Sequence, residues 1–143
     1  MDWKQYRRNY NEKVKELWGR TDVGYQNIKE AVKWGRKGEQ YALSVMPSLG
    51  FSNISDYANR NNQFFIDFIA TYNGKRVLVD ATIKHSAYIP EKIKLARDLD
   101  IPLYILFVSP NFDKHYLRLV EDKHHSVIKI PMSAMRALAC EVK

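Results

Sequence analysis

Apolar side chains recur at helical spacing over the start of the chain, and basic side chains fill much of the surface between them. The apolar positions are Trp3, Tyr6, Tyr10, Val14, Leu17 and Trp18. Residues at these spacings share one helix face, so the pattern predicts an amphipathic basic helix within residues 1–20 that ends at Gly19. A second helix is expected through residues 25–46, with Gly35 and Gly38 as candidate positions for a break or kink.

The middle of the chain carries a β-hairpin pattern. Residues 64–72 are rich in aromatic and β-branched side chains, Asn73-Gly74 follows, and residues 76–83 then alternate between apolar and polar. Asn-Gly between two such segments is the preferred sequence for a two-residue type I′ turn. The pattern therefore predicts two antiparallel strands joined at this turn, and a candidate short strand precedes them at 52–57.

Downstream of the hairpin, helical and strand patterns alternate. In order they predict a helix opened by Pro90, a strand over 103–108, a helix from Ser109-Pro110 to about Glu121, a strand over 126–130 and a helix from Pro131 through Ala139. The run 103–108 is apolar throughout, which is typical of a parallel strand buried on both faces. We therefore expect residues 1–143 to form one α/β domain, with a mixed central sheet flanked by helices.

The composition excludes several classes of protein. Hydrophobic residues make up 45% of the 143 and charged residues 27%, as in ordinary globular domains. A single cysteine rules out an internal disulfide and a cysteine-based zinc cluster. No apolar run approaches the roughly 18 to 20 residues that cross a bilayer, and the first residues show no signal-peptide pattern. We therefore expect an intracellular, cytoplasmic protein without a membrane partner.

Asp67 and Asp80 occupy facing positions in the predicted hairpin. A two-residue loop at 73–74 pairs residues whose numbers add to 147, as 67 and 80 do. Facing side chains are roughly 4.5–5.5 Å apart at Cβ, where two like charges oppose folding. A bound divalent cation explains such a pair, and Mg²⁺ (or Mn²⁺) prefers carboxylate oxygens.

Three further side chains are candidates for the same site. Thr82 and Lys84 follow Asp80 at every second position, so we expect them on its strand face. Glu39 lies three residues before Ala42 in the second helix, at the border of the face expected to pack on the sheet. Glu39 is a candidate third carboxylate. An ordinary exposed lysine is the alternative for Lys84.

Four short motifs follow one another between residues 38 and 80: Gly38-Glu39-Gln40-Tyr41-Ala42, Leu49-Gly50-Phe51, Phe65-Ile66-Asp67 and Val77-Leu78-Val79-Asp80. With the helix and buried strand that follow, residues 38–108 resemble the PD-(D/E)XK nuclease superfamily, in the branch of archaeal Holliday junction resolvases and small YraN-like proteins. The resemblance implies a restriction-endonuclease-like αβββαβ core. It also implies a Mg²⁺ site built by a helix glutamate, a strand aspartate and an acidic-x-Lys triplet, and the acidic roles fall on Glu39, Asp67 and Asp80.

Two residues depart from the superfamily pattern. Thr82 stands where the superfamily has its lysine, two residues after the second acid, and Ile66 replaces the proline before the first aspartate. Lys84 lies one step further along the same face, and its flexible four-carbon stem is long enough to reach back. Lys84 is therefore our candidate for the missing cation, whereas Thr82 could supply only a hydrogen bond.

Basic and polar side chains elsewhere are candidates for DNA contact. The 23 lysine and arginine residues outnumber the 16 acidic residues, and the net charge of +7 attracts polyanions. The candidates are Lys4, Arg7 and Arg8 in the first helix, Arg36 and Lys37 before Glu39, and Arg60, Asn62 and Gln63 before the hairpin. A solvated surface is the alternative for each group.

These patterns predict a Mg²⁺-dependent DNA endonuclease that hydrolyses phosphodiester bonds and acts as a homodimer on branched or site-specific duplex DNA. The alternative is a non-catalytic DNA-binding module that retains the nuclease fold but lacks the family lysine. Metal-dependent cleavage separates the two, because both are expected to bind DNA.

Overall fold

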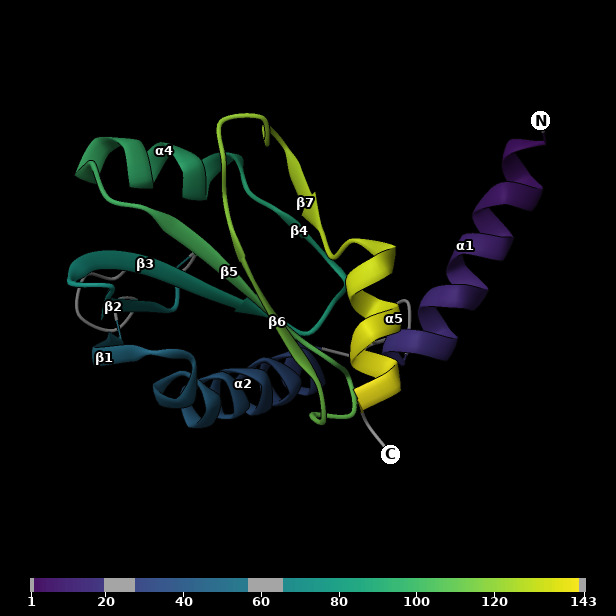
Figure 1. Cartoon of the computed structure of the whole chain (residues 1–143), viewed down its shortest axis with the longest axis horizontal. Helices are drawn as coiled ribbons and strands as arrows, with labels where there is room; N and C mark the ends of the chain where they lie inside the picture. Colours follow the sequence, from purple (N-terminus) through teal and green to yellow (C-terminus); the bar gives the residue numbers. More distant parts are fainter. Residues whose placement is uncertain (1, 20–27, 57–65, 142–143) are drawn as a thin grey trace.

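The computed structural model describes residues 2–19, 28–56 and 66–141, and these residues form a mixed α/β fold (Figure 1). The helices are α1 (Trp3–Trp18), α2 (Ile28–Val45), the 3₁₀ turn η1 (Pro47–Leu49), α4 (Pro90–Leu99) and α5 (Met132–Glu141). The strands are β1 (Phe51–Asp56), β2 (Phe68–Tyr72), β3 (Lys75–Thr82), β4 (Ser86–Tyr88), β5 (Leu103–Val108), β6 (His115–Leu119) and β7 (Val127–Lys129). The predicted α/β class is confirmed. Among the described helices, none is long and apolar enough to span a membrane.

Five strands form one mixed sheet in the order β1-β2-β3-β5-β6 (Figure 1). Neighbours are antiparallel except β3 and β5, which run parallel. A parallel pair needs a crossover connection, and α4 lies in the connection from β3 to β5. Strand β5 is buried along almost its whole length, which confirms the prediction from its apolar run. A second, two-stranded sheet pairs β4 antiparallel with β7.

The β2–β3 hairpin turns at Asn73-Gly74, as predicted. These two residues have positive φ angles of 52° and 78°. Positive φ at both central positions is characteristic of a type I′ turn. The ladder pairs Tyr72 with Lys75 and continues to Phe68 with Val79, so paired residue numbers add to 147 as expected.

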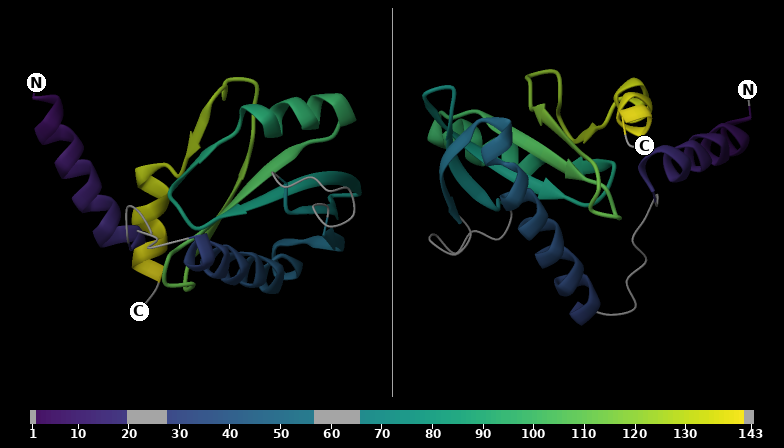
Figure 2. Two further views of the ribbon diagram at one scale, coloured as in Figure 1. Left: turned by 180° about the vertical axis from the view of Figure 1, so that it is seen from behind. Right: turned by 60° about the horizontal axis from the view of Figure 1, so that its bottom comes forward.

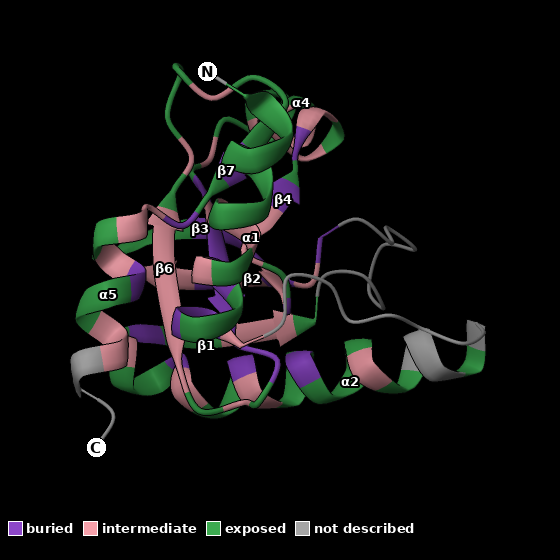
Figure 3. Ribbon diagram, turned by 90° about the vertical axis from the view of Figure 1, so that its right-hand side faces the viewer, coloured by how far each residue is buried: buried purple, intermediate pink, exposed green. Residues whose placement is uncertain are grey.

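Helices cover both faces of the larger sheet (Figure 2). On one face, Ala42 and Met46 of α2 pack with Val77 and Val79 of β3. On the other face, a second cluster gathers around Leu78, with buried side chains from α1, α5 and β7 and partly buried ones from α4. Strand β3 is therefore buried on both faces. Figure 3 shows that the buried residues lie mainly in the sheet, whereas most of α1 is exposed.

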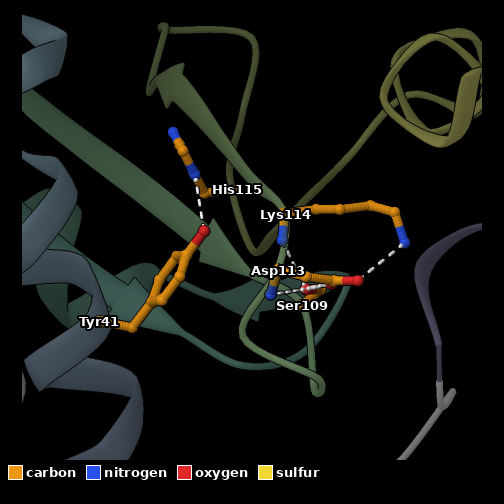
Figure 4. Close-up of polar contacts among 5 residues, drawn as sticks. All are labelled: Tyr41, Ser109, Asp113, Lys114 and His115. Atoms are coloured by element: carbon orange, nitrogen blue, oxygen red, sulfur yellow. Dashed lines mark hydrogen bonds and ion pairs between the residues drawn. The ribbon is translucent and has the colours of Figure 1, made fainter. Parts of the chain in front are cut away.

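The prediction of a helix from Ser109-Pro110 to about Glu121 is wrong, because the chain forms a tight turn directly after Ser109. The Phe112 N–H donates to the carbonyl of Ser109 at 2.8 Å, and Phe112 has a φ of 56°, which a right-handed helix does not allow. The Ser109 hydroxyl accepts a bond from the N–H of Asp113 and donates to its carboxylate, closing the turn (Figure 4). Residues His115–Leu119 then pair with β5 as the edge strand β6.

Helix α2 runs without interruption from Ile28 to Val45, so the candidate break at Gly35 or Gly38 is wrong. The expected start of this helix before residue 28 lies outside the described residues, as does the first part of the predicted strand at 64–65. Strand β1 confirms the candidate short strand before the hairpin. Strand β4, which pairs with β7, was not predicted from the sequence.

Candidate active site

Asp67 and Asp80 lie at the open end of the β2–β3 ladder. The last pair of the ladder joins Phe68 to Val79, and the two aspartates are the next residues on either side. Asp67 Oδ2 accepts a hydrogen bond of 2.8 Å from the backbone N–H of Ala81 in β3. Asp80 is inside β3 and only 8% exposed. The tight turn therefore brings the two carboxylates together, as the register predicts.

Glu39 joins this pair from α2. Its carboxyl group is hydrogen-bonded to that of Asp67. Partial burial raises the pKa of Glu39 to about 7 although its side chain remains exposed. The hydrogen bond and charge of Asp67 and the charge of Asp56 act in the same direction, and the charge of Arg36 opposes them. Burial and the negative charge of Asp80 raise the pKa of Asp67 to about 7. Near neutral pH Glu39 and Asp67 are therefore partly protonated, which reduces the repulsion among the three acids.

Gly38 allows α2 to approach the end of β3 closely. A Cβ atom built on Gly38 would lie 2.7 Å from Cγ2 of Ile83, closer than real Cβ atoms come to other atoms. Ile83 is buried, and its β-branched side chain has little freedom to move aside. The missing side chain at Gly38 thus sets the distance between α2 and the sheet, and with it the position of the adjacent Glu39.

Lys92 of α4 is in contact with Asp80, and it was not among the residues predicted for the site. Its Nζ lies 3.5 Å from Asp80 Oδ2 and donates to the carbonyl oxygen of Tyr88 at 3.3 Å. Burial raises the pKa of Asp80, and the charge of Lys92 opposes that rise. Lys92 shares a helix face with Leu95 and Ala96, which pack on the core. That spacing marks Lys92 as inward-facing, but which strand it meets depends on how α4 crosses the sheet.

Thr82 and Lys84 lie beside the acids without an interaction with them among the described contacts. Thr82 is the last residue of β3, so strand alternation does not extend to Lys84. The Lys84 N–H donates to Thr82 Oγ1 at 3.3 Å, and the lysine side chain is exposed. Both residues line a hollow of about 190 Å³ together with Gly38 and Glu39. The catalytic role of Lys84 stays a prediction.

The three carboxyl groups contain the oxygen atoms that a divalent cation would need, but they are not arranged around a common point. In the described parts of the chain, no three His, Cys, Asp or Glu side chains are arranged so that they could hold a metal ion. The raised pKa values of Glu39 and Asp67 instead mean that protons occupy part of these carboxyl oxygens near neutral pH. Loss of those protons would free hard oxygen ligands of the kind that Mg²⁺ prefers. The donor chemistry fits Mg²⁺, and binding would require the three side chains to rearrange.

The DNA-contact candidates divide into three groups. Arg36 and Lys37 are exposed on α2, and Arg36 lines a hollow of about 250 Å³ with Glu39. Lys4, Arg7 and Arg8 are exposed on the part of α1 that extends beyond the body of the protein, and the largest set of contacts of α1 is with α5 (Figures 1 and 2). The third group, Arg60, Asn62 and Gln63, lies outside the described residues. Only the α2 pair is therefore placed near the carboxylates.

Comparison of the sequence with protein-family models and with curated proteins finds no match. The assignment of a function therefore depends on the chemistry of the site and on the motifs that resemble the nuclease superfamily.

Proposed function

We propose that this chain is a Mg²⁺-dependent DNA endonuclease that hydrolyses phosphodiester bonds in branched or site-specific duplex DNA. The main observation behind the proposal is that three acids lie close together: Glu39 of α2, Asp67 just before β2 and Asp80 of β3. Asp80 also forms an ion pair with Lys92. Burying like charges together destabilises a fold unless protons or cations compensate. A divalent cation would provide that compensation, and it would also polarise the phosphate and activate water for hydrolysis.

The fold gives further support. The elements α2, β1, β2, β3, α4 and β5 follow the αβββαβ order that the resemblance implies, with β4 inserted before α4. The two aspartates lie at the open end of the hairpin, in the register that the turn sets. The net charge of +7 suits a polyanionic substrate.

Each residue of the site has a chemical role in this proposal. Asp67 and Asp80 supply oxygen ligands for the cation, which when bound polarises the phosphate and lowers the pKa of water. Glu39 has a pKa of about 7, so near neutral pH it can take up or give back a proton at its carboxylate. Lys92 favours the ionised form of Asp80 and adds positive charge where a phosphate would gain negative charge.

A cleavage assay tests the proposal. Purified protein is incubated with a four-way junction, a supercoiled plasmid and a linear duplex, each with Mg²⁺, with Mn²⁺ or with EDTA. We expect metal-dependent cleavage of at least one duplex substrate. Asp80→Asn should reduce the rate by roughly a hundredfold or more, because the ligand charge is lost. Asp98→Asn is the matched control, since Asp98 is exposed on α4. Equal rates for the two variants would remove the proposed site.

The non-catalytic DNA-binding module remains the second candidate, and Thr82 is the observation that favours it. Thr82 stands at the superfamily lysine position, and Lys84 is exposed beyond the strand end. Salt-dependent duplex binding without cleavage in any metal would support this candidate over the nuclease. The proposed homodimer is tested separately by sedimentation equilibrium with and without the junction.

A further inference from the structure

A hollow of about 270 Å³ lies between α1 and β7, and no residue of the carboxylate site lines it. Its lining residues are Trp3, Tyr6, Arg7, Tyr10 and Lys129. Trp3 is 72% exposed and Tyr6 53% exposed, whereas tryptophan and tyrosine are usually largely buried in single domains. Figure 3 shows this part of α1 in the exposed colour.

The exposed rings continue a stripe that is buried further along the same helix. Val14 and Leu17 of α1 belong to the core, and Tyr10 packs partly against it. Trp3 and Tyr6 follow the same helical spacing, but the first two turns of α1 extend beyond the body of the protein (Figures 1 and 2). The aromatic face therefore lacks a partner only where α1 leaves the core.

The chemistry of the hollow combines flat rings with positive charge. Trp3 and Tyr6 meet edge to face, with ring centroids 5.9 Å apart, which leaves a face of each ring open. The Lys129 Nζ lies 5.6 Å from the centroid of the Tyr10 ring. Arg7 also lines the hollow, and the first turn of α1 contains no acidic residue after the N-cap Asp2, whose carboxylate accepts from the helix N–H groups. Aromatic faces bordered by cations are the surface that binds unpaired nucleotides.

We infer that this hollow binds unpaired nucleotides of single-stranded DNA, with bases stacking on Trp3 and Tyr6 and phosphates contacting Arg7 and Lys129. The choice of DNA over RNA rests on the proposed nuclease function. A paired base offers its face only to its neighbours in the stack, so the hollow selects single strands or the unpaired arms of branched DNA. A second copy of this chain is the less favourable occupant, because a symmetric contact would set Arg7 and its neighbouring cations against the same residues.

Fluorescence anisotropy in EDTA tests the inference without cleavage. The probes are fluorescein-labelled oligo(dT), oligo(U) and a blunt duplex. Trp3→Ala should weaken oligo(dT) binding roughly tenfold, the loss of one stacked base, and leave duplex binding unchanged. Arg7→Ala should lower the salt slope for oligo(dT) by roughly 0.7, the value for one phosphate contact on a single strand. Tyr88→Ala is the matched control, since Tyr88 is 70% exposed on β4 and outside the hollow.

Each other outcome overturns the inference. Unchanged oligo(dT) binding by Trp3→Ala, or an equal loss for duplex and oligo(dT), removes the stacking role. Tighter binding of oligo(U) than of oligo(dT) assigns the hollow to RNA. Dissociation of a dimer by Trp3→Ala, measured by sedimentation, assigns it to self-association. By contrast, the expected result for Asp80→Asn is loss of metal-dependent cleavage with oligo(dT) binding retained, so failure of the nuclease proposal and failure of this inference give different results.

Discussion

The ammonium nitrogen of Lys92, in the first turn of α4, lies 3.5 Å from Oδ2 of Asp80 in β3. The two side chains are only 18% and 11% exposed, so the pair is shielded from most of the solvent. It connects the crossover helix to the strand that carries the acid. Lys92 reaches Asp80 from a helix that packs on the same side of the sheet, whereas the role expected of Lys84 stays a prediction.

Lys92→Met should impair both stability and cleavage. The variant leaves the buried Asp80 carboxylate without its cation, at a cost of roughly 1–3 kcal/mol in the free energy of unfolding. Cleavage should fall with it, because the pKa of Asp80 rises further when the opposing charge of Lys92 is gone. Urea denaturation and the plasmid assay measure the two effects.

Lys84→Met is the matched comparison for this prediction. Lys84 is exposed, so its replacement should change stability by less than about 0.5 kcal/mol. The double variant Lys92→Met/Asp80→Asn should recover part of the stability lost in Lys92→Met, since no charge is left unpaired. A larger loss of cleavage in Lys84→Met than in Lys92→Met would restore the role that the sequence assigned to Lys84.

The facing aspartates could be predicted because their relation is local. Asn73-Gly74 fixes the turn type, the turn fixes the register, and the register places Asp67 beside Asp80 within a few residues of the loop. No long-range packing enters this chain of causes. The same reasoning explains why β5 could be predicted from its own continuous apolar run.

Lys92 and β6 could not be predicted because both depend on packing between distant segments. The face of α4 that carries Lys92 is evident from spacing, but its contact with Asp80 follows from the crossover between β3 and β5. Ser109 forms the hydrogen bonds of a cap, and yet the chain continues as β6 because the open edge of β5 pairs with it. Local propensity was overridden there by strand pairing.

Substitutions at the two glycines of α2 should have opposite effects. Gly38→Ala places a Cβ 2.7 Å from Ile83 Cγ2, so it should destabilise the protein by roughly 1–3 kcal/mol and reduce cleavage by displacing Glu39. Gly35→Ala meets nothing within 4 Å and should stabilise the helix by roughly 0.5–1 kcal/mol. Thermal melts of both variants give the comparison. Similar melting temperatures would mean that α2 does not approach β3 as closely as described.

The metal-free protein should lose stability as pH rises toward and above 7. The pKa of Glu39 rises from 4.5 to about 7 and that of Asp67 from 3.8 to about 7. The folded chain therefore binds more protons than the unfolded chain between these values, so the contribution is present at acid pH and is lost as pH rises through about 7. His85 and His115 have lowered pKa values and act in the opposite direction near pH 6.

Comparison with a variant isolates the carboxylate contribution from that of the histidines. The melting temperature of the wild type in EDTA should fall relative to that of Asp67→Asn between about pH 5 and pH 8. The difference between the wild type and the exposed-site control Asp98→Asn should stay constant over the same range. Parallel curves for the wild type and Asp67→Asn would show that the acids do not share protons in the folded state.

Divalent cations should reverse this loss of stability at alkaline pH. Above pH 7 Glu39 and Asp67 are mostly ionised. A cation that binds only the folded chain then adds about 2.7 kcal/mol when its concentration is a hundred times its dissociation constant. We expect Mg²⁺ and Mn²⁺ to raise the melting temperature at pH 8 and to have little effect at pH 5, where protons occupy the same oxygens. Asp80→Asn should abolish the increase, and Asp98→Asn should preserve it. An equal increase in both variants would place the cation elsewhere on the protein, and cleavage would then need another explanation than these three acids.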